Sequence, residues 1–121
     1  MRPPKYRNKK TVIDGIAFDS IKESRRYGEL KLMLKAGLIS NLQIHPGFVL
    51  QPAFPDKRIG LTKRGKPRTV RAIEFTADFR YTEDGRDIVE DTKSPASKTT
   101  AYEIRKRLFL RKFPDVEFRE V

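Results

Sequence analysis

The sequence contains no cysteine and no tryptophan, and it has a single histidine, His45. The absence of cysteine excludes a disulfide scaffold, a thiol nucleophile and a zinc site with cysteine ligands, and it is consistent with a reducing cytosol. The chain offers no convincing Ser/His/Asp triad and no glycine-rich phosphate loop. No run approaches the roughly 18 apolar residues of a membrane span, and no apolar stretch follows the basic N-terminus as in a signal peptide. We therefore expect a cytoplasmic protein with no membrane association.

Acidic residues are too few to balance the basic ones: 16 Asp and Glu stand against 27 Lys and Arg, giving a net charge of +11 on 121 residues. Residues 1–10 and 57–71 contain no acid at all, and residues 98–112 contain one glutamate. Positive charge gathered in this way predicts a polyanionic partner, namely nucleic acid. A basic surface without a specific partner, as on a ribosome-associated protein, is the other interpretation.

Turn and capping signals divide the chain into short elements. Asp14-Gly15 predicts the turn of a small hairpin, and Ser20 with Glu23 predicts a capping box at the start of a helix. Hydrophobic residues make up 37% of the chain, enough for one modest domain over 11–121 behind a flexible basic arm over 1–10. The expected elements are a hairpin from Thr11 to Phe18, a helix over 21–36 that Gly37 ends, a strand over 42–51 interrupted at Pro46-Gly47, a long mobile loop over 52–68, a hairpin over 69–81 and 86–93, a helix from Thr100 (capped with Glu103) to Lys112, and a strand over 116–121.

This order of elements predicts a mixed sheet flanked by helices, in the α/β (α+β) class. Each helix should present one stripe of side chains to the sheet, because residues three or four apart share a helical face. The inward residues are expected to be Glu23, Tyr27, Leu30 and Leu34 on the first helix, and Ile104 and Leu108 on the second. Along 73–81, the residues Ile73, Phe75, Ala77, Phe79 and Tyr81 are expected to share one face of a strand.

The hairpin around Asp84-Gly85 places two aspartates opposite each other. Asp-Gly between two β-rich runs is a strong signal for a two-residue turn, and that turn pairs Asp78 with Asp91. Facing residues have Cβ atoms about 5 Å apart. Lys93 lies two positions beyond Asp91 and therefore points the same way.

A three-residue turn would instead pair Asp78 with Glu90, which has Thr92 and no lysine two positions on. Two carboxylates this close repel each other unless one keeps its proton or a divalent cation lies between them. The two-residue register suits a cation site better, because a lysine lies beside it. The plainer alternative is a solvated strand face that carries a surface Asp–Lys pair.

A cation site of this kind has the residue types that phosphodiester hydrolysis needs. Mg²⁺ prefers oxygen ligands and usually takes one or two carboxylates plus water and phosphate oxygens, with Mn²⁺ as its expected substitute. Asp78 and Asp91 are the predicted metal ligands, and Glu23 is either a further ligand, reaching the metal through water, or only a helix cap. Lys93 is expected to orient the attacking water or stabilise the developing anion. The number of metal ions stays open.

The residues expected to contact nucleic acid lie outside this centre. His45, beside Pro46-Gly47, is interpreted as structural or exposed, in preference to a metal ligand or general base. Tyr102 and Lys106 lie four apart on the second helix and are candidates for contact with a DNA backbone, or an ordinary exposed pair. The remaining candidates are Lys5, Arg7, Lys9 and Lys10 in the basic arm, and Lys63, Arg64, Lys66 and Arg68 in the basic loop over about 55–68.

Three segments occur in a telling order: Phe18-Asp19-Ser20 through Glu23, Ala77-Asp78-Phe79, and Val89-Glu90-Asp91-Thr92-Lys93. In this order they resemble the PD-(D/E)xK nuclease superfamily. They resemble still more closely a group of small phage-encoded proteins of formerly unknown function that was assigned to it. The resemblance covers roughly residues 5 to 119, and Ala77 stands where the superfamily name has proline, a variation that the superfamily tolerates.

The resemblance implies a restriction-endonuclease-like αβββαβ core and a Mg²⁺-dependent endodeoxyribonuclease. It carries over Glu23, Asp78, Asp91 and Lys93 as catalytic residues. Its relatives include phage junction-resolving endonucleases, so it also implies a phage- or prophage-encoded enzyme acting on branched DNA, such as a Holliday junction, in the bacterial cytoplasm. Two symmetric nicks would require a homodimer. The alternative is a non-catalytic nucleic-acid-binding protein whose carboxylates belong to a surface salt-bridge network.

Overall fold

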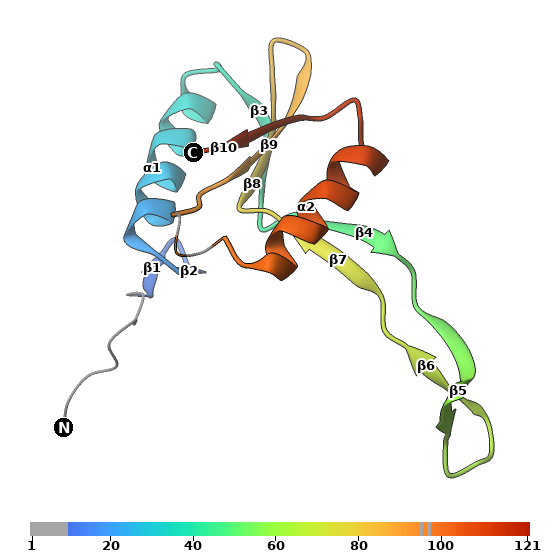
Figure 1. Cartoon of the computed structure of the whole chain (residues 1–121). Helices are drawn as coiled ribbons and strands as arrows, with labels where there is room; N and C mark the ends of the chain where they lie inside the picture. The colour runs from blue at the N-terminus through green and yellow to red at the C-terminus, as the bar shows by residue number, and fades with distance from the viewer. Residues whose placement is uncertain (1–9, 95, 97) are drawn as a thin grey trace, which may run out of the picture.

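The computed structural model describes residues 10–94, 96 and 98–121, and it is a mixed α+β structure (Figure 1). The central sheet has the strand order β10-β9-β8-β3, with β10 parallel to β9 and the other neighbours antiparallel. Its strands are β3 (Ser40–Ile44), β8 (Phe79–Glu83), β9 (Arg86–Asp91) and β10 (Glu117–Glu120). The helices α1 (Ile21–Lys35) and α2 (Thr100–Lys112) lie on opposite sides of this sheet (Figure 1). The predicted mixed sheet flanked by helices is confirmed.

The described residues form three further two-stranded sheets, all antiparallel. The first is the predicted N-terminal hairpin, in which Asp14 and Gly15 take positive φ angles of 53° and 76°. Positive φ at both turn residues is what a two-residue hairpin turn with right-handed twist requires. The three pairs are β1 (Thr11–Ile13) with β2 (Ile16–Phe18), β4 (Gly47–Gln51) with β7 (Ile73–Thr76), and β5 (Phe54–Leu61) with β6 (Pro67–Val70). Within the same part of the chain, no helix is long and apolar enough to cross a membrane.

Two apolar clusters hold the helices on the two faces of the sheet. Ile88 belongs to the α1 cluster and its neighbour Val89 to the α2 cluster, because successive strand residues point to opposite faces. Burying one such side chain fully contributes roughly 1.5–3 kcal/mol to the free energy of unfolding. The α1 cluster contains Phe18, Tyr27, Leu30, Ile39, Phe79, Tyr81 and Ile88, and the α2 cluster contains Phe48, Phe75, Ala77, Val89 and Phe109.

The prediction that certain helix residues face the sheet is wrong for three of them. Leu34, Ile104 and Leu108 are 38%, 51% and 47% exposed. On α2 the stripe that faces the sheet carries the aromatic side chains of Phe109 and Tyr102, and Phe113 at the C-cap joins them. Aromatic rings bury more apolar area than Ile or Leu, and this sets the rotation of the helix. The N-cap of α2 is Thr99, one residue before the predicted Thr100: its hydroxyl accepts a bond from the Tyr102 N–H at 3.1 Å.

The strand predicted over 69–81 is three strands, because its parts have different partners. The end of β6 pairs with β5, β7 pairs with β4, and β8 pairs with β9 and β3. The chain turns over between them at Ala77-Asp78, so Phe75 lies in the α2 cluster and Phe79 in the α1 cluster. The predicted shared face of residues 73–81 is therefore wrong. The interruption predicted at Pro46-Gly47 falls between β3 and β4.

The long mobile loop predicted over 52–68 is also wrong, because most of it forms the β5–β6 ribbon. Asp56 pairs with Arg68 and Leu61 with Pro67, so the intervening residues of β5 bulge out of the pairing. This bulge breaks the alternation by which a strand is recognised in a sequence. The ribbon closes through a turn in which the Thr62 N–H donates to the Lys66 carbonyl at 2.7 Å. Figure 1 shows the ribbon extending away from the two helices.

Candidate functional site

The two-residue turn predicted between β8 and β9 is confirmed. Glu83 pairs with Arg86 and Phe79 with Glu90, and Asp84 has a positive φ of 51°. Asp78, one residue before β8, therefore lies opposite Asp91 at the end of β9. The β8–β9 pairing ends at Phe79–Glu90, and the backbone N–H of Asp78 still donates to the Glu90 carbonyl at 3.1 Å, which keeps Asp78 beside the end of β9. The register that sets the two aspartates against each other is the one that the fold adopts.

Asp91 is the unusual group of this site. Its side chain is fully buried, and neither carboxylate oxygen has a hydrogen-bond partner among the described residues. Lys93 is the nearest cation, with its Nζ 3.7 Å from Asp91 Oδ2. Burial, and after it the charge of Asp78, raises the pKa of Asp91 to about 7, although Lys93 opposes the rise. A buried carboxylate without hydrogen-bond partners costs free energy, so a role other than stability is indicated.

Asp78 is half-buried and held in a fixed orientation by Thr92. Its Oδ2 accepts a bond from the Thr92 N–H at 2.6 Å and a second from the Thr92 hydroxyl. Thr92 lies between Asp91 and Lys93 in the sequence, so three consecutive residues contribute to one site. The sequence pattern Asp-Thr-Lys therefore supplies a carboxylate, a group that orients the opposing carboxylate, and a cation.

Glu90 provides the contrast, because it is equally buried yet fully paired. Arg26 of α1 donates from Nε and Nη2 to its two oxygens, each at 2.7 Å, and the Tyr81 hydroxyl also donates to it. Burial and the bond to Glu90 raise the pKa of Tyr81 to about 12. Glu90 therefore stabilises the α1 side of the sheet, while its neighbour Asp91 faces the other side with Lys93 nearby and with no hydrogen bond to its carboxylate among the described residues.

Replacing Arg26 by Met is expected to lower the free energy of unfolding by about 3 kcal/mol near neutral pH, because it leaves the Glu90 carboxylate buried without its cation. Chemical denaturation of the two proteins would measure the difference. Arg25→Met is the matched control, since Arg25 is exposed on the same helix. Equal losses in the two variants would mean that the Arg26–Glu90 pair does not hold α1 on the sheet.

Glu23 and His45 form a second group beside Asp78. Glu23 is 4% exposed at the start of α1, where its N–H donates to Ser20 Oγ at 3.1 Å as the capping box predicts. Its Oε1 lies 2.7 Å from Nε2 of His45, and the His45 N–H donates to the Asp78 carbonyl at 2.9 Å. Burial raises the pKa of Glu23, and the bond to His45 partly opposes this. The role of Glu23 as a metal ligand stays a prediction, because in this structure its carboxylate contacts the histidine.

His45 lies beside the site, although the sequence alone gave no reason to place it there. It connects β3 to β4 with a positive φ of 53°, a conformation uncommon for residues other than glycine. The only local signal was that a lone histidine precedes Pro46. Its contact with Glu23 spans 22 residues of sequence, so it depends on the fold.

Tyr102 and Lys106 of α2 lie on the other side of Lys93. The Lys93 Nζ is 5.0 Å and the Lys106 Nζ 5.6 Å from the centre of the Tyr102 ring. The Tyr102 hydroxyl donates to Glu120 Oε2 at 2.7 Å, and burial together with this bond raises its pKa. Two of the predicted nucleic-acid contacts are thus brought beside the predicted catalytic lysine.

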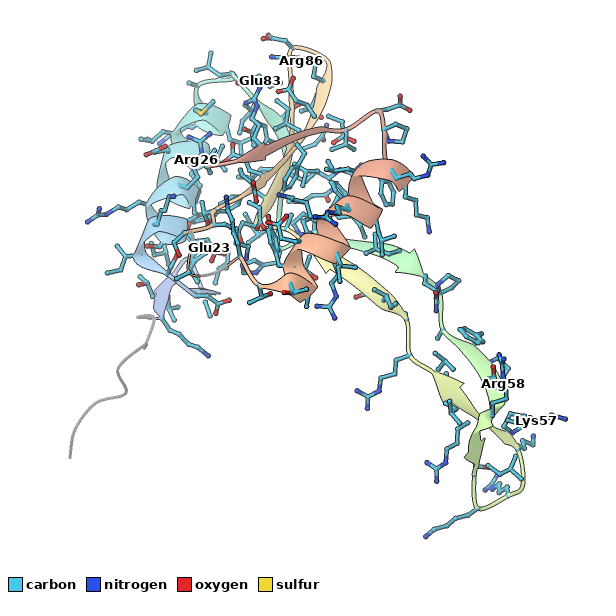
Figure 2. The ribbon with its side chains drawn as sticks, in the orientation of Figure 1. Glu23, Arg26, Lys57, Arg58, Glu83 and Arg86 are labelled. Carbon is cyan, nitrogen blue, oxygen red and sulfur yellow. The ribbon has the colours of Figure 1, made fainter. Side chains whose placement is uncertain are left out.

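The other predicted contact residues lie apart from this centre. Lys63, Arg64, Lys66 and Arg68 are on the β5–β6 ribbon or in its turn, and Figure 2 shows the neighbouring Lys57 and Arg58 far from Glu23. Lys10 is exposed. Lys5, Arg7 and Lys9, with most of the predicted flexible arm over 1–10, lie outside the described residues.

The donor set fits a hard divalent cation that takes only part of its ligands from the protein. Asp91 offers two buried oxygens that have no hydrogen bond among the described residues, and Asp78 lies opposite it. Among the described residues, no group of three or more acidic or histidine side chains could hold a metal ion. Mg²⁺ accepts such a site, because it commonly keeps several waters and binds substrate phosphates beside one or two carboxylates.

Comparison of the sequence with known proteins identifies one matching family. A family model described as a protein of unknown function, DUF1064, matches residues 3–121. No curated protein and no solved structure matches the chain.

Proposed function

The chain belongs to the DUF1064 family, and we propose that it is a metal-dependent endonuclease that hydrolyses phosphodiester bonds in DNA. The observation that carries the proposal is Asp91, a fully buried carboxylate without hydrogen-bond partners among the described residues, set opposite Asp78 and 3.7 Å from Lys93. Such a site is costly for stability and suited to a cation. The net charge of +11 supports a polyanionic substrate.

Each residue has a distinct part in the proposed chemistry. Asp78 and Asp91 would hold Mg²⁺, or Mn²⁺ in its place. When bound, the ion supplies charge neutralisation at the phosphate and lowers the pKa of bound water. Lys93 lies where it can orient the attacking water or stabilise the negative charge that develops on the phosphate. Thr92 fixes the orientation of Asp78, and the Tyr102 ring supports the Lys93 ammonium group.

The arrangement of elements supports membership of the PD-(D/E)xK superfamily, which is part of the proposal. The two helices and the four strands of the central sheet occur along the chain as α1, β3, β8, β9, α2 and β10, with β4–β7 inserted between β3 and β8. This is the order αβββαβ that the resemblance implies. Glu23 stands on the first helix of that order, Asp78 directly before β8, and Lys93 just after β9.

Cleavage of a four-way DNA junction and of a matched linear duplex, each with Mg²⁺, Mn²⁺ or EDTA, tests the proposal. Paired symmetric nicks in the junction alone would identify a Holliday-junction resolvase acting as a homodimer. Cutting of both substrates would identify a more general endonuclease. The second candidate function is a non-catalytic nucleic-acid-binding protein, and the basic β5–β6 ribbon is the observation that supports it. DNA binding without cutting under any of these conditions would favour this second candidate.

Replacing Lys93 by Ala is expected to slow cleavage by about 10²–10³-fold, the effect typical of losing one group that stabilises transition-state charge. Initial rates under single-turnover conditions would measure it, and a thermal melt would check that the variant is folded. Lys98→Ala is the matched control, because Lys98 pairs with Glu120 at 3.6 Å instead of with Asp91. Full activity in folded Lys93→Ala protein would remove the proposed role of Lys93.

A further inference from the structure

The β5–β6 ribbon continues a longer two-stranded ribbon whose base is the candidate site. At the base, β4 pairs with β7 beside α2, and β5 pairs with β6 beyond them (Figure 1). In the described part of the chain, β5 and β6 form a sheet of their own. His45 comes two residues before β4, and Asp78 follows two residues after β7. From here on, "the arm" means residues 54–70 and not the basic N-terminal segment over 1–10. Both strands of the arm lead directly back to the site.

The arm and the residue after it carry strong positive charge. Residues 54–71 contain seven cations and one acid, Asp56. Asp56 is bonded to Arg58, both through the Arg58 side chain and through its N–H at 2.8 Å. Among the described residues, no acidic partner is present for the other cations, which are Lys57, Lys63, Arg64, Lys66, Arg68 and Arg71.

The arm also exposes apolar side chains. Phe54, Ile59 and Leu61 are 39%, 53% and 53% exposed. A narrow ribbon with unpaired cations and uncovered apolar groups has the chemistry of a nucleic-acid contact, in which cations meet phosphates and apolar groups meet base edges or sugars. A two-stranded β-ribbon also has dimensions that fit the major groove of B-form DNA.

We propose that the arm lies in a groove of double-stranded DNA and holds the duplex on one side of the phosphate that is cut. This inference rests on the proposed function, because it takes DNA as the substrate. The chain from β6 through β7 covers residues 67–76, with 71–72 between the two strands, and spans about 30 Å when extended. One turn of B-form DNA is about 34 Å. The arm therefore contacts DNA roughly one helical turn from the site.

Charge argues for DNA and against a second copy of this chain as the partner. Two arms packed together would bring their like charges into contact, which is unfavourable across an interface. A duplex offers one phosphate charge per about 1.7 Å of its axis, the opposite sign at matching density.

A shortened arm tests the inference in a protein whose core is unchanged. Replacing residues 57–67 by Asn-Gly closes the ribbon at the Asp56–Arg68 pair with a two-residue turn. Binding is measured in EDTA, where no metal-dependent cleavage occurs, to a duplex and to a single strand of the same sequence. We expect duplex affinity to fall at least tenfold, single-strand affinity to change less, and the hydroxyl-radical footprint to shorten by about one helical turn on one side only.

A charge variant separates the arm from net charge alone. Replacing Lys63, Arg64 and Lys66 by Gln is expected to reduce the slope of log affinity against log salt by about 2–3, since each phosphate contact contributes about 0.9. The control replaces three exposed cations of the helices, Lys35, Arg107 and Arg111, by Gln, so it changes the net charge by the same amount. An equal change of slope in the control would overturn a specific role for the arm.

Three other results would overturn the inference. They are duplex binding by the shortened arm at wild-type affinity, an equal loss of duplex and single-strand binding, and a shift from dimer to monomer in sedimentation with DNA binding retained. Failure of the proposed function would give a different result. The wild-type protein would not cut DNA under any condition, while the protein with the shortened arm would still bind duplex DNA more weakly. That result would support the DNA-binding role of the arm and contradict only the nuclease activity.

Discussion

Asp91→Asn is expected to abolish metal-dependent DNA cleavage and to leave DNA binding within about twofold of the wild-type value. Asn keeps the shape of the side chain and removes the charge that would hold the cation. The fully buried Asp91 carboxylate does not contact solvent, so its loss should not change the surface that meets phosphates. Single-turnover cleavage and a binding assay in EDTA measure the two parts separately.

Asp115→Asn provides the control for this change, because it makes the same chemical substitution at an exposed position. It should cut and bind as the wild-type protein does. Cleavage by Asp91→Asn at the wild-type rate would show that the site is assigned to the wrong residues. Loss of binding together with cleavage would mean that Asp91 acts on the fold or the surface and not on the reaction.

The same substitution is expected to stabilise the metal-free protein as the pH rises. The pKa of Asp91 lies at about 7 in the folded protein against an ordinary value of 3.8. Below about pH 4 the carboxyl group is protonated in the folded and unfolded states alike, so it adds no pH-dependent term. Between pH 4 and 7 the unfolded state ionises first, and the wild-type protein loses stability; above pH 7 the loss is complete.

The difference in unfolding free energy between Asp91→Asn and wild type should therefore move by about 2–4 kcal/mol in favour of the variant from pH 4 to pH 8. Urea denaturation in EDTA at the two pH values measures this difference. Any effect of the Asn side chain that does not depend on pH is the same at both pH values and cancels when they are compared. Mg²⁺ at pH 8 should stabilise the wild type more than matched NaCl does, and should not stabilise the variant. A difference that stays the same at both pH values would contradict the burial of an ionised Asp91.

The parts of the fold that the sequence predicted are those decided by neighbouring residues. The Asp84-Gly85 turn sets the β8–β9 register by itself, because both residues adopt positive φ angles. The start of α1 is set within four residues of chain, because the Ser20 hydroxyl accepts a bond from the Glu23 N–H. The turn alone was enough to predict the opposition of Asp78 and Asp91.

The parts that sequence reasoning missed depend on contacts between distant segments. The strand break at Asp78 arises because β7 and β8 have partners in different sheets, which no local pattern records. The rotation of α2 follows from Phe109 packing against Phe48 and Phe75. Likewise, the partner of Glu23 is a histidine 22 residues away. Alternation, which predicts strands, fails in the arm because of its bulge.

The turn between β8 and β9 has a consequence for which changes in length the protein can accept. Exposed loop tips are usually the places where an inserted residue is tolerated. Here one added residue, if it slipped β9 by one position against β8, would turn every side chain of β9 to the opposite face. Asp91 would then face the aromatic residues packed under α1, and Glu90 would enter the site without Arg26 beside it. We conclude that this surface turn is fixed in length by the chemistry at the far end of its strands.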